Sequence, residues 1–83
     1  MEATVFEVIA GQIKRQPEDV SLDMRLDELG IDSLEAITIL YELEERYEIE
    51  IPNEVFESIK TVGDIVYQLN RILADSSPAR HNG

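Results

Sequence analysis

Apolar residues recur at helical spacing in three stretches of this 83-residue chain. The first stretch predicts a helix over residues 4–15, with Thr4 and Glu7 as a capping box and the apolar positions Val5, Phe6, Ile9 and Ile13. The third stretch has the clearest 3.6-residue period, and it follows a second capping-box signature, Thr61 and Asp64. Its apolar positions are Val62, Ile65, Val66, Leu69, Ile72 and Leu73. These stretches predict the first and last helices of a helical domain.

The middle stretch, residues 34–47, contains no glycine or proline and predicts a helix with two apolar stripes. The first stripe consists of Ala36, Ile39, Leu40, Leu43 and Tyr47. The second stripe lies about 120° away at ~100° per residue, and consists of Leu34, Ile37 and Tyr41. We expect the first stripe to face the core. The second covers the long first loop, forms an exposed apolar patch beside Ser33 suited to transient protein contact, or does both.

The connections between these helices complete the predicted fold. Residues 17–31 form a long first loop, and Pro52 with Asn53 marks a turn into a short third helix that buries Val55, Phe56 and Ile59. The sequence therefore predicts an all-α fold, a small four-helix bundle with three main helices and one short one. We expect this domain to span residues 1–75 and residues 76–83 to form a disordered polar tail.

The chain is strongly acidic, with 18 Asp and Glu against 7 Lys and Arg, for a net charge of −11. Residues 27–57 hold eleven acids and one base, Arg46, so this segment carries almost all of the excess. Such a surface argues against nucleic acid and anionic membranes as partners and favours proteins with basic docking patches. The chain has no cysteine, signal peptide or membrane-spanning run, so we expect a cytoplasmic monomer without membrane insertion.

The start of the middle helix holds the most informative chemistry. Asp32 and Ser33 are both strong N-cap residues, and Gly30 permits a tight turn before them. A helix N-terminus presents unpaired N–H groups, so a hydroxyl placed there can carry a phosphate. A serine nucleophile, however, needs a general base, and the only histidine is His81 in the predicted tail. With no metal-binding motif either, we expect neither a metal site nor catalytic residues, and therefore no enzyme.

Four motifs give the chain a resemblance to the acyl carrier protein family between Val5 and Leu73. They are Leu29-Gly30-x-Asp32-Ser33-Leu34-Glu35, Leu43-Glu44-Glu45-x-Tyr47, Glu50-Ile51-Pro52 and Thr61-Val62-x-Asp64. The resemblance implies a four-helix bundle that carries 4'-phosphopantetheine on Ser33. A separate phosphopantetheinyl transferase, with Mg²⁺ and coenzyme A, would attach this arm. Its thiol would hold an acyl group as a thioester for fatty acid, polyketide or other specialised lipid synthesis.

The same resemblance implies roles for further residues. Asp32 and Leu34 would help to present Ser33 to the transferase. Acyl-transfer, condensing and modifying enzymes would dock on Glu35, Ile37, Thr38, Tyr41, Glu42, Glu44 and Glu45, together with Leu34. An acyl pocket would be lined by Leu40, Leu43, Tyr47, Phe56, Ile59, Ile65 and Leu69.

The chain also departs from the pattern of the family. Thr38 stands where fatty-acid-type carriers commonly have glutamate, Tyr41 where methionine is common, and Phe56 and Ile65 where residues are often smaller. These departures favour a specialised carrier with little open acyl cavity. A peptidyl carrier and a D-alanyl carrier are alternatives within the family. A non-covalent acidic helical interaction module, with Ser33 unmodified, is the alternative from another class.

Overall fold

The computed structural model describes residues 1–82, and the side chains of residues 1–74. Four α-helices follow one another along the chain, α1 (Glu2–Ile13), α2 (Ser33–Tyr47), α3 (Asn53–Ser58) and α4 (Val62–Asn82). A short 3-10 helix, η1 (Pro17–Asp19), lies in the first loop. No strand occurs within the described part of the chain, so the predicted all-α fold is confirmed. None of the helices described is long and apolar enough to cross a membrane.

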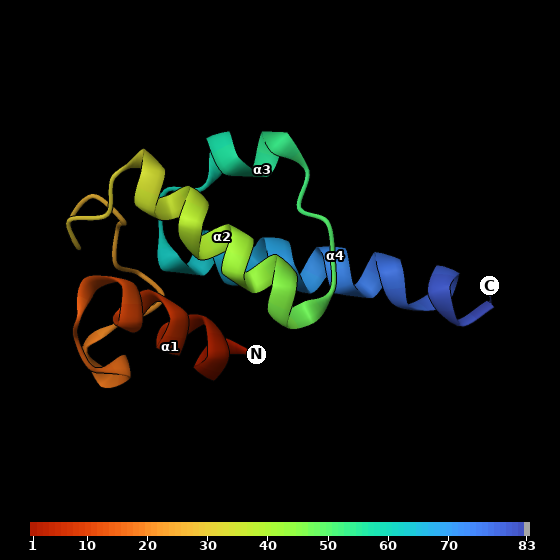
Figure 1. The fold of residues 1–83 in the computed structure, drawn as a ribbon, viewed down its shortest axis with the longest axis horizontal. Helices are drawn as coiled ribbons and strands as arrows, with labels where there is room; N and C mark the ends of the chain where they lie inside the picture. Colours follow the sequence, from red (N-terminus) through yellow and green to blue (C-terminus); the bar gives the residue numbers. More distant parts are fainter. Residues whose placement is uncertain (83) are drawn as a thin grey trace.

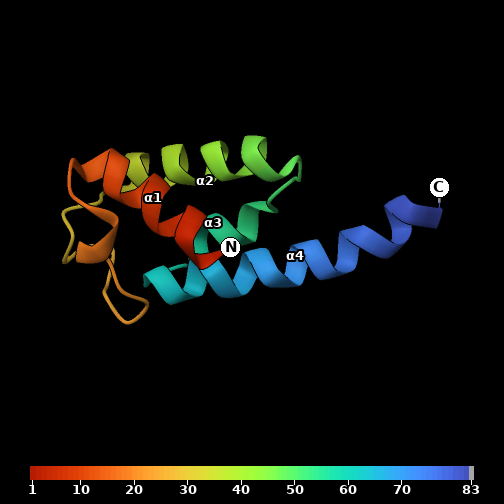
Figure 2. The same ribbon diagram turned by 90° about the horizontal axis from the view of Figure 1, so that it is seen from below.

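The helices pack as a small bundle around an aliphatic core (Figure 1). Helix α1 packs against both α2 and α4, and the short α3 packs against α2. Both views show the C-terminal part of α4 extending beyond the other helices (Figures 1 and 2). The most deeply buried large side chains come from the three long helices, namely Val5, Ile9, Ile39, Leu40, Leu43, Val62, Ile65 and Leu69. The predicted core stripes of all three long helices therefore meet in one cluster.

Helix α1 begins and ends earlier than the sequence predicts. The predicted capping box at Thr4 is wrong, because the amide of Val5 donates to the carbonyl oxygen of Met1 (3.1 Å) and the first turn already starts there. At the other end Lys14 takes the left-handed conformation at φ 60°, and the amides of Lys14 and Arg15 both bond to the carbonyl oxygen of Ala10. The helix therefore ends in a left-handed cap at Lys14 rather than at Arg15.

The long first loop is fixed by its own apolar side chains and by backbone contacts with the start of α4. Val20, Leu26 and Ile31 are buried in the core. The amide of Leu26 donates to the carbonyl oxygen of Lys60 (2.9 Å), and the amide of Val62 donates to that of Met24 (3.0 Å). These bonds hold the loop beside α4 and so set where the chain enters α2.

Helix α4 has the predicted start but runs further than expected. The amide of Asp64 donates to the Thr61 hydroxyl (3.1 Å), and the amide of Thr61 donates to the Asp64 carboxylate (3.1 Å), which confirms the capping box. The helix continues to Asn82, so residues 76–82, expected to belong to a disordered tail, are helical. Gly83 lies outside the described residues.

Candidate functional site

The start of α2 is fixed by a turn and a reciprocal cap. Gly30 has φ 78°, a left-handed conformation that glycine adopts without steric cost, and Ile31 anchors the next position in the core. The amide of Glu35 donates to Asp32 Oδ1 (2.8 Å), and the amide of Asp32 donates to Glu35 Oε1 (3.2 Å). Asp32 is therefore the N-cap and closes a capping box with Glu35.

Ser33 is the first residue of α2, and its side chain is exposed. Because Asp32 supplies the cap, the Ser33 hydroxyl is not needed for it and makes no hydrogen bond to the described residues. Leu34, beside it, is 74% exposed. The positive end of the helix dipole lies at this point, so a negatively charged group on Ser33 is favoured. The site thus presents an exposed hydroxyl at the positive end of a helix.

No hydrogen bond joins the Ser33 hydroxyl to a basic side chain among the described residues. The nearest carboxylate in sequence, that of Asp32, accepts a backbone hydrogen bond from Glu35 and serves as the helix cap. The one histidine, His81, lies outside the residues whose side chains are described. Within the described residues no three His, Asp or Glu side chains are grouped as metal ligands. A serine activated by an adjacent base is therefore not seen in the described part of the chain.

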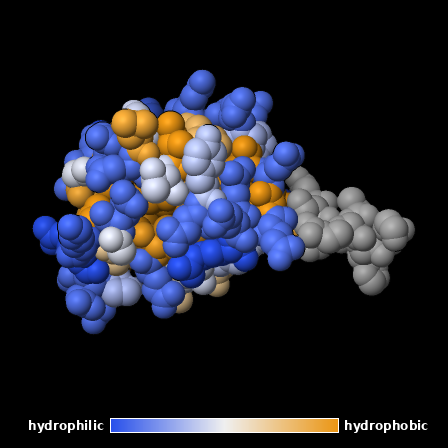
Figure 3. All heavy atoms as spheres, in the orientation of Figure 1, coloured by the Kyte–Doolittle hydropathy of each residue, from blue (hydrophilic) through white to orange (hydrophobic). Residues whose placement is uncertain are grey.

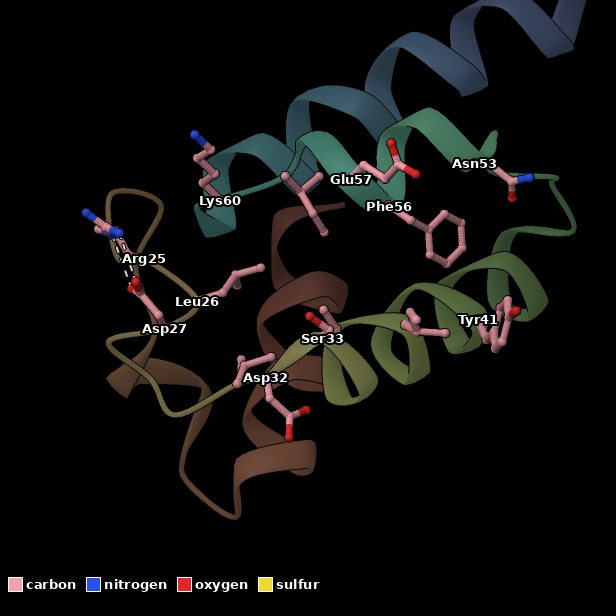
Figure 4. Close-up of a pocket in the computed structure, with 14 residues that line it drawn as sticks. Arg25, Leu26, Asp27, Asp32, Ser33, Tyr41, Asn53, Phe56, Glu57 and Lys60 are labelled. Atoms are coloured by element: carbon pink, nitrogen blue, oxygen red, sulfur yellow. Dashed lines mark hydrogen bonds and ion pairs between the residues drawn. The ribbon is translucent and has the colours of Figure 1, made fainter.

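Ser33 lies on the wall of an open groove of about 780 Å³ between the first loop, α2 and α3. We call this space the α2–α3 groove. Its lining residues include Leu26, Ile31, Ser33, Ile37, Tyr41, Phe56, Ile59 and Lys60. Figure 4 shows Ser33 near the middle of the groove, with Tyr41 and Phe56 facing each other on one side and Arg25 and Lys60 on the other. One side is therefore aromatic, and the other carries Lys60 and the ion pair between Arg25 and Asp27.

The second apolar stripe of α2 is an exposed patch. Tyr41 is 58% exposed and Leu34 more so, while Ile37 is half-buried in the α2–α3 groove. Figure 3 shows apolar surface gathered over the first half of α2 and over α3, with hydrophilic surface around it. Of the two interpretations open from the sequence, the structure favours the apolar patch beside Ser33.

The polar residues predicted to dock partners differ in how free they are. The Glu35 carboxylate accepts from the Asp32 amide (3.2 Å), and that of Glu42 accepts two hydrogen bonds from Arg46 (3.0 and 3.2 Å). The Thr38 hydroxyl donates to the carbonyl oxygen of Leu34 (3.0 Å). The Glu44 carboxylate accepts a hydrogen bond from the amide of Ile51 (2.7 Å). Glu45 is exposed. Docking roles for these residues stay predictions, and Glu44 has a structural role besides.

The residues predicted to line an acyl pocket separate into two groups. Leu40, Leu43, Ile65 and Leu69 are at most 1% exposed and pack in the core. Tyr47, Phe56 and Ile59 are half-buried around it, and of these Phe56 and Ile59 line the α2–α3 groove. The structure thus brings all seven into contact with one core, while the open space beside Ser33 touches only two of them.

Two groove residues, Arg25 and Lys60, were not found by reasoning from the sequence. The guanidinium of Arg25 pairs with the Asp27 carboxylate (2.8 Å), and both are exposed. Lys60 stands directly before the capping box of α4. Only the backbone bridge between the first loop and the start of α4 places the two cations together, and no local sequence pattern signals that bridge.

Comparison with known proteins defines the class to which this fold and site belong. The family model for the phosphopantetheine attachment site matches residues 3–68. The acyl carrier protein of Wolinella succinogenes is 43% identical over 63 residues, which cover 75% of this chain and 83% of the relative. The acyl carrier protein of a Sulfurovum species is 40% identical over 63 residues, covering 75% and 84%.

A solved structure agrees with the fold. The crystal structure of an acyl carrier protein from Thermotoga maritima superposes with a TM-score of 0.78 at 23% identity, covering 88% of this chain and 86% of the other. The chain belongs to the acyl carrier protein family, as its motifs predict, and is a carrier rather than an enzyme. Membership implies a 4'-phosphopantetheine prosthetic group.

Proposed function

We propose that Ser33 carries the 4'-phosphopantetheine arm and that the protein presents acyl groups on it, as thioesters, to cytoplasmic enzymes of fatty acid, polyketide or specialised lipid synthesis. The observation that carries this proposal is the exposed Ser33 hydroxyl at the first position of α2, left free because Asp32 caps the helix. Of the residues near the start of α2, only Ser33 offers a hydroxyl in this position.

The attachment follows from the chemistry of the two groups. The Ser33 Oγ forms a bond to phosphorus in the pyrophosphate of coenzyme A, and the phosphorus–oxygen bond to the nucleotide part breaks. The hydroxyl proton passes to a base of the transferase, because the carrier offers none. The arm supplies the thiol that this cysteine-free chain lacks.

Partner enzymes would meet the exposed second stripe and the acids around it. Leu34 and Tyr41 supply apolar contact area, and the acidic segment of residues 27–57 would steer basic surfaces toward Ser33. Thr38 and Tyr41 give this face a chemistry different from that of fatty-acid-type carriers, which supports specialised partners. Peptidyl and D-alanyl carriers share the attachment chemistry and differ in the group that is loaded.

Intact-mass analysis tests the proposal. After incubation with coenzyme A, Mg²⁺ and a broad-specificity phosphopantetheinyl transferase, the purified protein is expected to gain the mass of one arm. A protein that remains unmodified under conditions that fully load a control carrier would instead support the non-covalent interaction module.

A further inference from the structure

We infer that Glu35 is a positioning residue for attachment of the arm. Together with Asp32 it fixes the residue at which α2 begins, and this start decides whether the Ser33 hydroxyl is free for the transferase or bound within the helix. The inference rests on the proposed function, in which Ser33 receives the arm. It gives Glu35, for which the family resemblance implies a docking role, a task inside the carrier itself.

Two neighbouring residues compete for the N-cap of α2. Aspartate and serine are both strongly preferred at this position, where the side-chain oxygen accepts a hydrogen bond from an amide two or three residues further on. In the structure Asp32 is the cap, and its Oδ1 accepts from the amide of Glu35 (2.8 Å). Ser33 therefore lies inside the helix, and Figure 4 shows the two side chains turned to different sides of the helix start.

The amide of Ala36 distinguishes the two possible starts of α2. In the structure it donates to the carbonyl oxygen of Asp32 (2.9 Å), as the first bond of the regular helical pattern. If Ser33 were the cap instead, the Ala36 amide would lie three residues after the cap and would donate to Ser33 Oγ. The helix would then begin one residue later, at Leu34. The Ala36 amide thus has two alternative acceptors, and only one of them leaves the hydroxyl free.

A cap formed by Ser33 would hinder the attachment chemistry. In that reaction a lone pair of Ser33 Oγ forms the bond to phosphorus, the hydroxyl proton passes to a base of the transferase, and the phosphorus–oxygen bond to the nucleotide part breaks. As a cap, the same oxygen would accept a hydrogen bond from Ala36 and be turned over the first turn of the helix. Such an oxygen is a weaker and less accessible nucleophile. The observed start of α2 is therefore the reactive one.

Glu35 biases the helix toward this reactive start. Its Oε1 accepts from the amide of Asp32 (3.2 Å), which is the second half of the capping box. A cap formed by Ser33 would need a glutamate or glutamine at position 36 for the same reciprocal bond, and the chain has alanine there. The reciprocal bond is thus available to one start and absent from the other. Its loss is expected to shift the balance between the two starts roughly two- to tenfold.

Chemical shifts of the unloaded protein report the start of α2 directly. The Cα shift of Ser33 should have a helical value in wild type and should move toward the value of an extended N-cap residue in Glu35→Ala. In Asp32→Ala, which removes the competing cap, it should move further in the same direction. Glu35→Gln keeps an oxygen that accepts from the Asp32 amide, so it should match wild type. A helical Ser33 shift in all four proteins would overturn the inference.

Transferase kinetics separate positioning from docking. We expect kcat/KM for transfer of the arm to fall roughly two- to tenfold in Glu35→Ala and to stay near the wild-type value in Glu35→Gln. A docking role for the charge predicts instead that both variants are slowed alike and that their difference from wild type disappears at high NaCl. Glu7→Ala, which removes an exposed acid from α1, controls for net charge and should match wild type.

Failure of this inference and failure of the proposed function give different results. If wild type takes up no arm, attachment at Ser33 is wrong and the inference falls with it. If wild type loads and Glu35→Ala loads at the same rate, only the inference is overturned. The inference is likewise overturned if Glu35→Gln is slowed as much as Glu35→Ala.

Discussion

Replacing Glu44 by alanine removes the acceptor that fixes the chain between α2 and α3. The Glu44 carboxylate accepts a hydrogen bond from the Ile51 amide at 2.7 Å, and the carbonyl oxygen of Glu44 accepts from the amides of Glu48 and Ile49. Glu48 adopts a left-handed conformation at φ 53°, so the chain turns sharply there before Ile51 enters the core. The carboxylate is thus a local anchor for the return of the chain toward α3.

The loss of stability expected in Glu44→Ala follows from the kind of hydrogen bond that it removes. A hydrogen bond to a charged group contributes about 1.5–3 kcal/mol to the free energy of unfolding. With a urea m-value of about 1 kcal/mol/M for so small a domain, the unfolding midpoint of Glu44→Ala should fall by about 1.5–3 M. Glu44→Gln keeps a neutral acceptor and should lose roughly half as much.

Glu45→Ala is the matched control, because it removes the same charge from the next position of α2, where the side chain is exposed. We expect its free energy of unfolding to stay within about 0.5 kcal/mol of the wild-type value. Equal midpoints for Glu44→Ala and Glu45→Ala would show that the Ile51 bond does not hold the turn. The stability of Glu44 variants also has to be known before any loss of acyl transfer is attributed to docking.

Three further predictions concern the glycines, the core and the charge. Gly11→Ala should raise the free energy of unfolding by about 0.5–1 kcal/mol, since Gly11 lies in a helix and an added Cβ meets nothing within 4 Å. Gly63→Ala should lower it, since its Cβ would lie 3.0 Å from the carbonyl oxygen of Leu22, and urea melts of the two variants check this. Leu43→Ala, in the core, should cost about 2–5 kcal/mol, and the exposed Tyr41→Ala should cost about 0.5–1.5; equal losses of Tm would place Tyr41 in the core. Added NaCl should raise Tm, because screening relieves repulsion in a chain of net charge −11, and a Tm that falls or stays flat would refute this.

The sequence predicted the features that depend on short-range chemistry. Thr61 and Asp64 lie three positions apart, so their capping box could be recognised locally and then appeared in the structure. Asp32 was one of two N-cap residues proposed from the sequence, and its reciprocal bond with Glu35 was found only in the structure. The core stripe of α2 was equally clear from its period. Thr4 was misplaced because the same three-residue spacing with Glu7 also occurs inside a helix, and only the bond from Val5 to Met1 shows the true start.

Contacts between distant segments could not be predicted in this way. The Tyr41–Phe56 pair, the bond from Ile51 to Glu44, and the bridge that brings Arg25 beside Lys60 all depend on how helices and loops pack. Glu44 shows the consequence most clearly. The family resemblance implied a docking role for it, while the packed structure gives its carboxylate a hydrogen bond within the protein.

Site-resolved loading tests the central claim most directly. Wild type, Ser33→Ala and Ser21→Ala are incubated with coenzyme A and the transferase, and their intact masses are measured. Ser21 is the matched control, a serine in the first loop whose hydroxyl donates to the Asp23 carboxylate (2.7 Å). Because Asp32 is the helix cap, Ser33→Ala should stay folded with nearly the wild-type Tm. We expect one arm on wild type and on Ser21→Ala and none on Ser33→Ala, whereas an arm on folded Ser33→Ala would show that Ser33 is not the attachment site.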